Sequence, residues 1–256
     1  MISNFANFKT TSRPAILLAG PPGTGKTVIS SMLGTPFIIE LDNNHAGAFN
    51  YLQSIHADCK ATVSVPFIRD DGTVIPRAER WKAMNAAITS GISNPSRTTL
   101  VIDSLSALIE IGLDEVRRQQ NRKIGDPIKG EKDEPLQIQD WGAFKGLMRQ
   151  WFINLRAAGK VLVVTAHITT YKDELTGILQ EFINFPGQFA EEIAGLFTEV
   201  WLTDIEEKRN GTTVEYIYTI RTRPQPSQRK IGLKSGIQLP PKVPVDFANL
   251  NKLLFP

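Results

Sequence analysis

The sequence predicts an α/β protein whose mostly parallel sheet is flanked by helices and followed by a C-terminal β-hairpin. Two observations lead to this fold class. Short, continuous apolar runs alternate with longer helical patterns up to about Glu199, which is typical of parallel strands joined by helices. After Glu199 the pattern changes to two segments that flank Asn210 and Gly211, and the second of them alternates apolar and polar side chains.

Short apolar runs are the predicted strands. They are continuous rather than alternating, which indicates that helices cover both faces of the sheet. The clearest helix is predicted over residues 140–157, where large apolar side chains recur at steps of three and four and form one stripe for core packing. The predicted strands are residues 15–19, 37–41, 62–68, 100–103, 161–166 and 199–202.

Two long segments are expected to be mobile loops. Residues 121–135 carry charges of both signs with glycine and proline but no apolar period, and residues 169–187 follow a predicted strand and contain Gly177, Pro186 and Gly187. Loops of this length are uncommon in a compact domain unless they are functional.

The predicted hairpin consists of residues 199–205 and 213–222, and from Gly236 onward Pro240, Pro241 and Pro244 indicate an extended tail. The chain is therefore expected to divide into three parts. These are an N-terminal segment (residues 1–13), a core (14–235) and a proline-containing tail (236–256).

The composition is that of an ordinary globular protein, with 256 residues, 41% hydrophobic and 21% charged, and a formal net charge of +3. A charge this small gives no strong field for nucleic acid if it is spread evenly. The apolar runs fall far short of the roughly 18 residues that span a bilayer, and the polar N-terminus resembles no targeting signal, so we expect a cytoplasmic location and no membrane contact. The lone Cys59 excludes an internal disulfide.

A glycine-rich turn between a predicted strand and a predicted helix is the strongest motif. Two glycines five residues apart precede Lys26 and Thr27, which is the spacing of a phosphate-binding P-loop. Backbone N–H groups of such a turn surround the β-phosphate, Lys26 supplies a charge to the β- and γ-phosphates, and the Thr27 hydroxyl is a ligand for Mg²⁺. The binding residues are Gly20, Pro21, Pro22, Gly23, Thr24, Gly25, Lys26 and Thr27.

A carboxylate at the end of a buried strand completes the expected metal site. Asp103 ends the run 100–103, and a buried carboxylate at that place is costly unless it faces a cation. The residue after it is Ser104, so the base that activates water has to come from another strand. Glu40 and Asp42 end the strand after the P-loop helix, and we favour Asp42 over Glu40 because it lies nearer the strand end.

His167 directly follows the predicted strand 161–166 and is expected to point at the nucleotide, because the carboxyl ends of parallel strands form the ligand crevice. There it could donate a hydrogen bond to the γ-phosphate and transmit the loss of this group to the following loop.

Together these features resemble the RecA-like P-loop ATPases over roughly residues 14–235, and more narrowly the small phage-encoded members that include single-strand annealing recombinases. The resemblance implies ATP and Mg²⁺ as cofactors and single-stranded DNA as a partner, bound by the loops 121–135 and 169–187. It also implies a homo-oligomer in which Arg229 and Lys230 complete the active site of a neighbouring subunit. The features are Gly20 to Thr27, the Glu40/Asp42 strand end, the Asp103-Ser104 pair, and the strand end Thr165-Ala166-His167.

Two other functions stay open. The loop sequence from Gly20 to Thr27 is common in AAA-type ATPases such as helicase loaders or remodellers that act on a protein, although Ser104 and the C-terminal hairpin argue against that class. A small-molecule kinase would need an arginine-rich lid, which the sequence does not offer. Between Arg221 and Lys234 there are five basic residues and no acidic one, so the excess positive charge lies in one segment that suits either a neighbour's phosphates or a nucleic-acid backbone.

Overall fold

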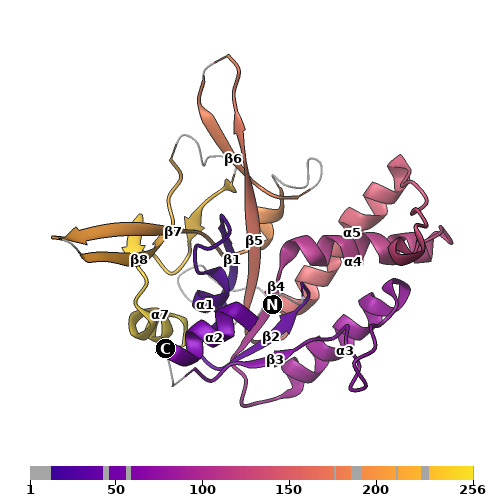
Figure 1. Cartoon of the computed structure of the whole chain (residues 1–256), viewed down its shortest axis with the longest axis horizontal. Helices are drawn as coiled ribbons and strands as arrows, with labels where there is room; N and C mark the ends of the chain where they lie inside the picture. Colours follow the sequence, from indigo (N-terminus) through magenta and orange to yellow (C-terminus); the bar gives the residue numbers. More distant parts are fainter. Residues whose placement is uncertain are drawn as a thin grey trace, which may run out of the picture.

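A computed structural model describes residues 13–42, 46–55, 59–175, 177–185, 192–211, 213–225 and 231–255. A ten-stranded sheet forms its centre, in the order β10-β8-β7-β1-β5-β4-β2-β3, with β6 paired to β5 and β9 paired to β7 (Figure 1). The strands are β1 (Ala15–Gly20), β2 (Pro36–Glu40), β3 (Thr62–Ser64), β4 (Thr99–Asp103), β5 (Val161–Lys172), β6 (Leu179–Ile183), β7 (Glu199–Asn210), β8 (Thr213–Arg221), β9 (Lys234–Ser235) and β10 (Lys242–Pro244).

The predicted fold class is confirmed. Strand β1 lies between β5 and β7 and runs parallel to both, and β5, β4, β2 and β3 continue the parallel half. Strands β7 and β8 form the predicted antiparallel hairpin, in which Asn210 pairs with Thr213 at the turn. The P-loop therefore leaves the sheet at its middle, between two parallel neighbours.

Helices cover both faces of the sheet, as the continuous apolar strands predict. Alternate residues of β1 enter two separate cores: Leu17 packs with side chains of α3, α4 and α5, whereas Ile16 and Leu18 pack with side chains of α1 and α7 (Figure 1). None of the described helices is long and apolar enough to cross a membrane. The helices are α1 (Lys26–Ser31), α2 (Ala46–Ile55), α3 (Arg80–Ser93), α4 (Leu105–Gln119), α5 (Ile138–Arg156) and α7 (Phe247–Leu254).

The interpretation of residues 169–187 as an irregular loop is wrong for the described part. Strand β5 continues past the sheet to Lys172 and returns as β6, with pairs from Ile168–Ile183 to Lys172–Leu179. Figure 1 shows this β5–β6 hairpin projecting beyond the body of the protein. The extension is polar and exposed, so the apolar pattern that marks the buried half of β5 stops at Ala166.

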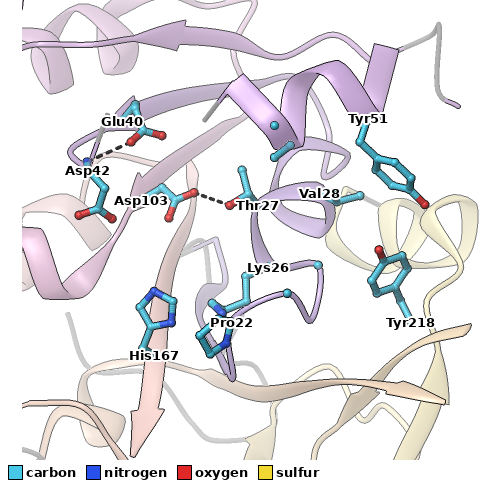
Figure 2. A pocket seen from close by; sticks show the side chains of 14 residues that line it. Pro22, Lys26, Thr27, Val28, Glu40, Asp42, Tyr51, Asp103, His167 and Tyr218 are labelled. Carbon is cyan, nitrogen blue, oxygen red and sulfur yellow. Dashed lines mark hydrogen bonds between the residues drawn. The ribbon is translucent and has the colours of Figure 1, made fainter. Parts of the chain in front are cut away.

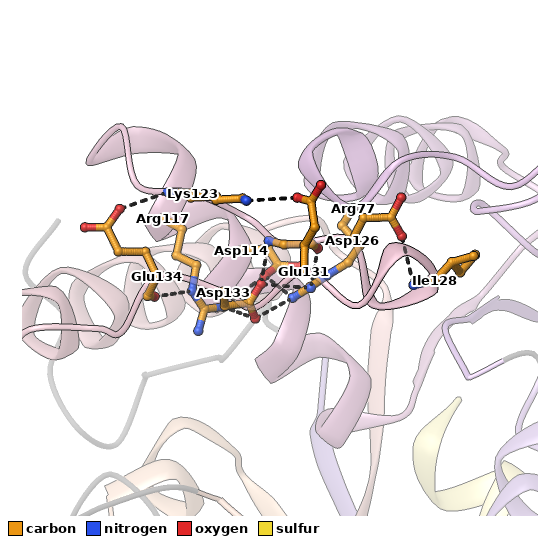
Figure 3. A network of polar contacts seen from close by, with 10 residues as sticks. Arg77, Asp114, Arg117, Lys123, Asp126, Ile128, Glu131, Asp133 and Glu134 are labelled. Atoms are coloured by element: carbon orange, nitrogen blue, oxygen red, sulfur yellow. Dashed lines mark hydrogen bonds and ion pairs between the residues drawn. The ribbon is translucent and has the colours of Figure 1, made fainter.

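Residues 121–135 have little regular structure, but ion pairs attach them to the helices (Figure 3). The Arg77 guanidinium donates to both carboxylate oxygens of Asp114, at 2.8 and 2.7 Å, and to both oxygens of Asp133, at 3.0 Å each. Within the segment, the Lys123 ammonium lies 3.0 Å from a Glu131 carboxylate oxygen. Three of the four basic side chains of this segment form ion pairs with carboxylates of the protein, namely Arg122, Lys123 and Lys129.

The C-terminal residues are not the extended tail that the prolines indicate. Strand β10 pairs with β8. Asp246 caps the N-terminus of helix α7, where its side chain accepts a hydrogen bond from the Asn249 backbone N–H at 3.1 Å. Leu250 and Leu254 of α7 are buried against the sheet. The division of the chain at residues 13 and 235 stays a prediction.

Candidate functional site

The P-loop forms a tight turn between β1 and α1. Gly23 and Gly25 have φ values of 81° and 79°, a region that favours glycine. The Lys26 ammonium folds back over the loop and donates to the carbonyl oxygens of Gly20, at 3.0 Å, and Pro21, at 2.7 Å. Burial lowers the pKa of Lys26 to about 8, although the charge of Asp103 opposes this shift.

Asp103 is held by hydroxyl groups on two different elements. Its Oδ2 accepts a hydrogen bond from Thr27 Oγ1 at 2.8 Å, and its Oδ1 accepts one from the buried Thr165 Oγ1 at 2.5 Å. The two residues expected to bind metal, Thr27 and Asp103, are therefore adjacent, and Thr165 fixes the carboxylate in one orientation.

Glu40 and Asp42 lie beside Asp103 because β2 and β4 are neighbours, with Glu40 opposite Asp103 in the register. The two carboxylates have different surroundings. Both side chains line the cavity, but Glu40 is buried and accepts a hydrogen bond from the Asp42 backbone N–H at 3.0 Å, whereas Asp42 is the more exposed of the two. Loss of surrounding water raises the pKa of the Asp42 carboxyl, and the negative charge of Asp103 adds to the increase.

His167 lies on β5, directly opposite Gly20 in the pairing with β1. Its position brings the imidazole to the P-loop side of the cavity, across from Asp42 and Asp103 (Figure 2). Burial lowers the pKa of His167, and the nearby charge of Lys26 lowers it further against the opposing charges of Asp42 and Asp103. The ring Nδ1 is buried and has no hydrogen-bond partner among the described residues.

A cavity of about 350 Å³ joins these residues. Of the predicted site residues, it is lined by Pro22, Gly23, Gly25, Lys26, Thr27, Glu40, Asp42, Asp103 and His167. The cavity is not lined by the other three predicted P-loop residues, Gly20, Pro21 and Thr24. Within the loop, the Thr24 hydroxyl donates a hydrogen bond to the Pro21 carbonyl oxygen at 2.8 Å. Arg229 and Lys230, predicted to act on a neighbouring subunit, lie outside the described residues.

Among the residues at this site that the sequence did not predict are Thr203, Tyr51 and Tyr218. The Thr203 hydroxyl on β7 lies 2.6 Å from the Thr24 hydroxyl, and Tyr51 of α2 and Tyr218 of β8 line the cavity. The alternation of apolar and polar residues in β8 predicts only that the Tyr218 side chain lies on the apolar face of that strand. Nothing in the linear sequence places α2 and β8 at the P-loop, because that contact follows from the strand order.

The family comparison agrees with this geometry. The model of the AAA_24 family, which is described as an AAA domain, matches residues 12–229. This range is most of the chain. The chain belongs to the AAA_24 family. Curated protein sequences offer no match to it.

Solved structures similar to the AAA_24 chain include three of low sequence identity. The first is a KaiC-like protein, PH0186, from the hyperthermophilic archaeon Pyrococcus horikoshii OT3, at 13% identity over 82% of this chain and 80% of that one, with a TM-score of 0.40. The flagellar accessory protein FlaH from Methanocaldococcus jannaschii follows at 11% identity, covering 82% and 78%, with a TM-score of 0.36. The RadB recombinase is 9% identical, covers 84% of both chains and has a TM-score of 0.42.

Together, the P-loop at the end of the central strand, the acidic strand ends beside it and the family match identify this AAA_24 chain as a P-loop protein of the ATPase type. Where a helical lid would follow the core of an AAA-type remodeller, this chain has the β7–β8 hairpin within its sheet.

Proposed function

We propose that this chain hydrolyses ATP with Mg²⁺ and uses the energy to act on single-stranded DNA, in recombination, annealing or replication of the kind that phages encode. The observation that supports the ATPase part most directly is the Thr27–Asp103–Thr165 arrangement in the same cavity as Asp42 and His167. The DNA part rests on the resemblance and on the projecting β5–β6 hairpin.

The donor set suits Mg²⁺. This ion prefers oxygen ligands and usually keeps a few protein contacts beside phosphate and water, which the Thr27 hydroxyl and the Asp103 carboxylate can provide. Bound there, the ion would neutralise charge on the β- and γ-phosphates. When the nucleotide binds, the Lys26 ammonium would give up its hydrogen bonds to the Gly20 and Pro21 carbonyl oxygens and donate to the β- and γ-phosphates instead.

We assign to Asp42 the role of the base. Its carboxylate accepts a proton from a water molecule as the water oxygen bonds to the γ-phosphorus and the bond to the β,γ-bridging oxygen breaks. Glu40 then has a supporting role, because it is buried and already accepts the Asp42 backbone N–H. This favours Asp42 over Glu40, in line with the preference drawn from the sequence.

His167 is proposed to connect the nucleotide to the hairpin. It lies on the strand that leaves the cavity and continues into the exposed part of β5, where Tyr171 is 61% exposed and contacts Phe182. A base of single-stranded DNA can stack on an exposed aromatic ring of this kind, with Lys172 beside it for a phosphate. The ion-paired basic side chains of residues 121–135 make that segment the weaker candidate for DNA.

We further propose a homo-oligomer in which Arg229 and Lys230 reach the nucleotide of a neighbour, as in the RecA-like proteins that the chain resembles. A cation opposite the transferred phosphoryl group can raise the rate by several orders of magnitude. Replacement of both residues by alanine should therefore remove ATP turnover without removing ATP binding.

A protein partner is the second candidate, and one observation favours it. The turn of the β5–β6 hairpin exposes Leu175, Ile178 and Leu179, which are 98%, 47% and 55% exposed. Apolar side chains at a projecting tip suit a protein surface better than a phosphate backbone.

Two measurements test the proposal. ATP turnover is measured for the wild type and Lys26→Ala, with and without single-stranded DNA and with duplex DNA as the control. We expect stimulation by single-stranded DNA only, and no turnover in Lys26→Ala. Failure of the wild type to bind ATP would reject the ATPase site.

The hairpin variants separate the two partners. Tyr171→Ala should weaken single-stranded DNA binding by about tenfold through lost stacking, whereas Leu175→Ser should leave it unchanged. Unchanged DNA affinity in Tyr171→Ala, with no DNA stimulation in the wild type, would favour the protein partner.

A further inference from the structure

A groove beside the start of α3 is lined mainly by apolar side chains. Its volume is about 390 Å³, and it shares no lining residue with the nucleotide cavity. Two of its side chains are strongly exposed, Ile128 at 96% and Val74 at 61%. Exposed apolar side chains that gather in a hollow are typical of a surface that another protein covers. The apolar lining includes Val74, Ile75, Pro76, Ile124 and Ile128.

Both walls of the groove are held in place by the protein itself. On one side the Ile75 backbone N–H donates to the Phe67 carbonyl oxygen at 2.8 Å, which closes a short turn. On the other side the Arg77 guanidinium donates to the Gly125 carbonyl oxygen at 3.1 Å and binds Asp133 (Figure 3). The Asp133 carboxylate in turn accepts the Gly125 backbone N–H at 2.8 Å. A partner side chain can therefore enter a groove that is already formed.

One cation of the groove is left without a carboxylate. The Arg80 guanidinium lies over the Phe67 ring, 5.2 Å from its centre, and its Nε donates a long hydrogen bond of 3.4 Å to the Ile75 carbonyl oxygen. In the described part of the chain Arg80 has no ion pair, whereas Arg77 is paired on two sides. The groove thus suits a partner that carries a carboxylate next to its apolar side chains.

The tip of the β5–β6 hairpin has this complementary chemistry. Leu175, Ile178 and Leu179 are exposed there, and the neighbouring Glu174 is exposed and has no ion pair with another described residue. Figure 1 shows the hairpin projecting from the body, well apart from the start of α3 that borders the groove. The tip of one chain is therefore suited to the groove of another.

We propose that the hairpin tip docks into this groove on a second copy of the chain, with its apolar side chains in the hollow and Glu174 paired with Arg80. The inference rests on the homo-oligomer proposed above, for which it names a contact. Because tip and groove are different surfaces, the contact is head-to-tail, and each copy can use both surfaces at once. Such contacts build a ring or a filament rather than a closed pair.

Self-association of the whole chain is measured by sedimentation velocity over a range of protein concentrations, without nucleotide or DNA. Leu175→Ser removes apolar area from the tip, and Ile128→Ser removes it from the groove. Each should weaken association at least about tenfold. Leu253→Ser is the matched control, because Leu253 is also an exposed leucine but lies on α7, outside both surfaces, and it should associate as the wild type does.

A mixture of the two variants tests the head-to-tail arrangement. Leu175→Ser keeps an intact groove and Ile128→Ser keeps an intact tip, so one complete contact forms between them. We expect a 1:1 complex that grows no further, although each variant alone is monomeric at the same concentration. Full self-association of Ile128→Ser alone would indicate a contact between two tips and would overturn the proposal.

An exchange of charges tests the ion pair. Glu174→Arg and Arg80→Glu should each weaken association, because like charges then face each other, whereas the double variant should recover most of it. Equal losses in the double variant and in both single variants would exclude this pairing.

The outcomes separate this inference from the oligomer on which it rests. If the wild type associates and neither Leu175→Ser nor Ile128→Ser weakens the association, the docking contact is refuted and the homo-oligomer stands. If the wild type stays monomeric at every concentration, with and without ATP, the homo-oligomer is wrong and the contact fails with it.

Discussion

The hydroxyl of Thr24 in the P-loop lies 2.6 Å from the hydroxyl of Thr203 on β7. Both side chains are buried, and Thr203 Oγ1 also lies 3.2 Å from the Ala19 carbonyl oxygen. The back of the phosphate-binding turn is thus fastened to the neighbouring parallel strand.

Thr203→Val should loosen this attachment while keeping the shape of the side chain. We expect a loss of about 1 kcal/mol in the free energy of unfolding, the usual value of one buried hydrogen bond, and weaker ATP binding. Urea denaturation and calorimetric titration measure the two effects. Thr219→Val, a buried threonine of the same sheet on β8, is the control and should leave ATP affinity intact; equal affinities in both variants would contradict the prediction.

Thr165→Val should weaken the binding of Mg²⁺ rather than the binding of the nucleotide. It removes the donor to Asp103 Oδ1, so the carboxylate loses its fixed orientation. Partners of metal ligands typically contribute 10- to 100-fold in affinity, and we expect the Mg²⁺ concentration for half-maximal turnover to rise by about tenfold. Thr165→Ser keeps the hydroxyl and should behave as the wild type, and an unchanged Mg²⁺ dependence in Thr165→Val would count against this role.

The lowered pKa of Lys26 predicts proton uptake on nucleotide binding. Above about pH 8 the ammonium of the free protein loses its proton, but the phosphates favour the charged form, so binding takes up a proton and affinity falls as the pH rises. Below about pH 7 Lys26 is already charged and adds no uptake. Calorimetry at pH 8.5 in two buffers of different ionisation enthalpy measures the proton count; Lys26→Arg, always charged, should show none from this position.

Substitutions of Asp42 and of Glu40 should affect different properties of the protein. Asp42→Asn should abolish turnover and retain ATP binding, whereas Glu40→Gln should mainly reduce thermal stability, since Glu40 is buried and supports the Asp42 backbone. Because the pKa of Asp42 is raised, the acidic limb of the rate profile should lie at higher pH than an ordinary aspartate gives. Turnover by Asp42→Asn with loss in Glu40→Gln would reverse the two roles.

The sequence allowed the phosphate end of the site to be predicted because its signals are local. The apolar run of β1, the glycine turn and the strand ending at Asp103 each lie within a few residues, and the structure brings Thr27 and Asp103 into contact. The β5–β6 hairpin was missed because Tyr171 and Lys172 are exposed and pair through their backbones, which leaves no apolar period.

The tyrosine end could not be predicted for a different reason. Tyr51 and Tyr218 meet at the cavity only because β7 and β8 continue the sheet on the far side of β1. The sequence of residues 121–135 predicts a mobile loop because it carries charges of both signs with glycine and proline but no apolar period, whereas in the structure Arg77 binds Asp114 of α4 and Asp133 of the segment itself.

Helix α7 has a consequence for how the protein matures. The Asn251 side chain accepts a hydrogen bond from the Gly34 backbone at 2.8 Å and donates to the Met32 carbonyl at 3.0 Å, at the end of the helix that follows the P-loop. During synthesis, the ribosome makes the phosphate-binding turn early, but α7 emerges after every strand of the sheet. The outer face of α1 stays uncovered until then, so a nascent chain is expected to become competent for ATP only after residues 242–254 have left the ribosome.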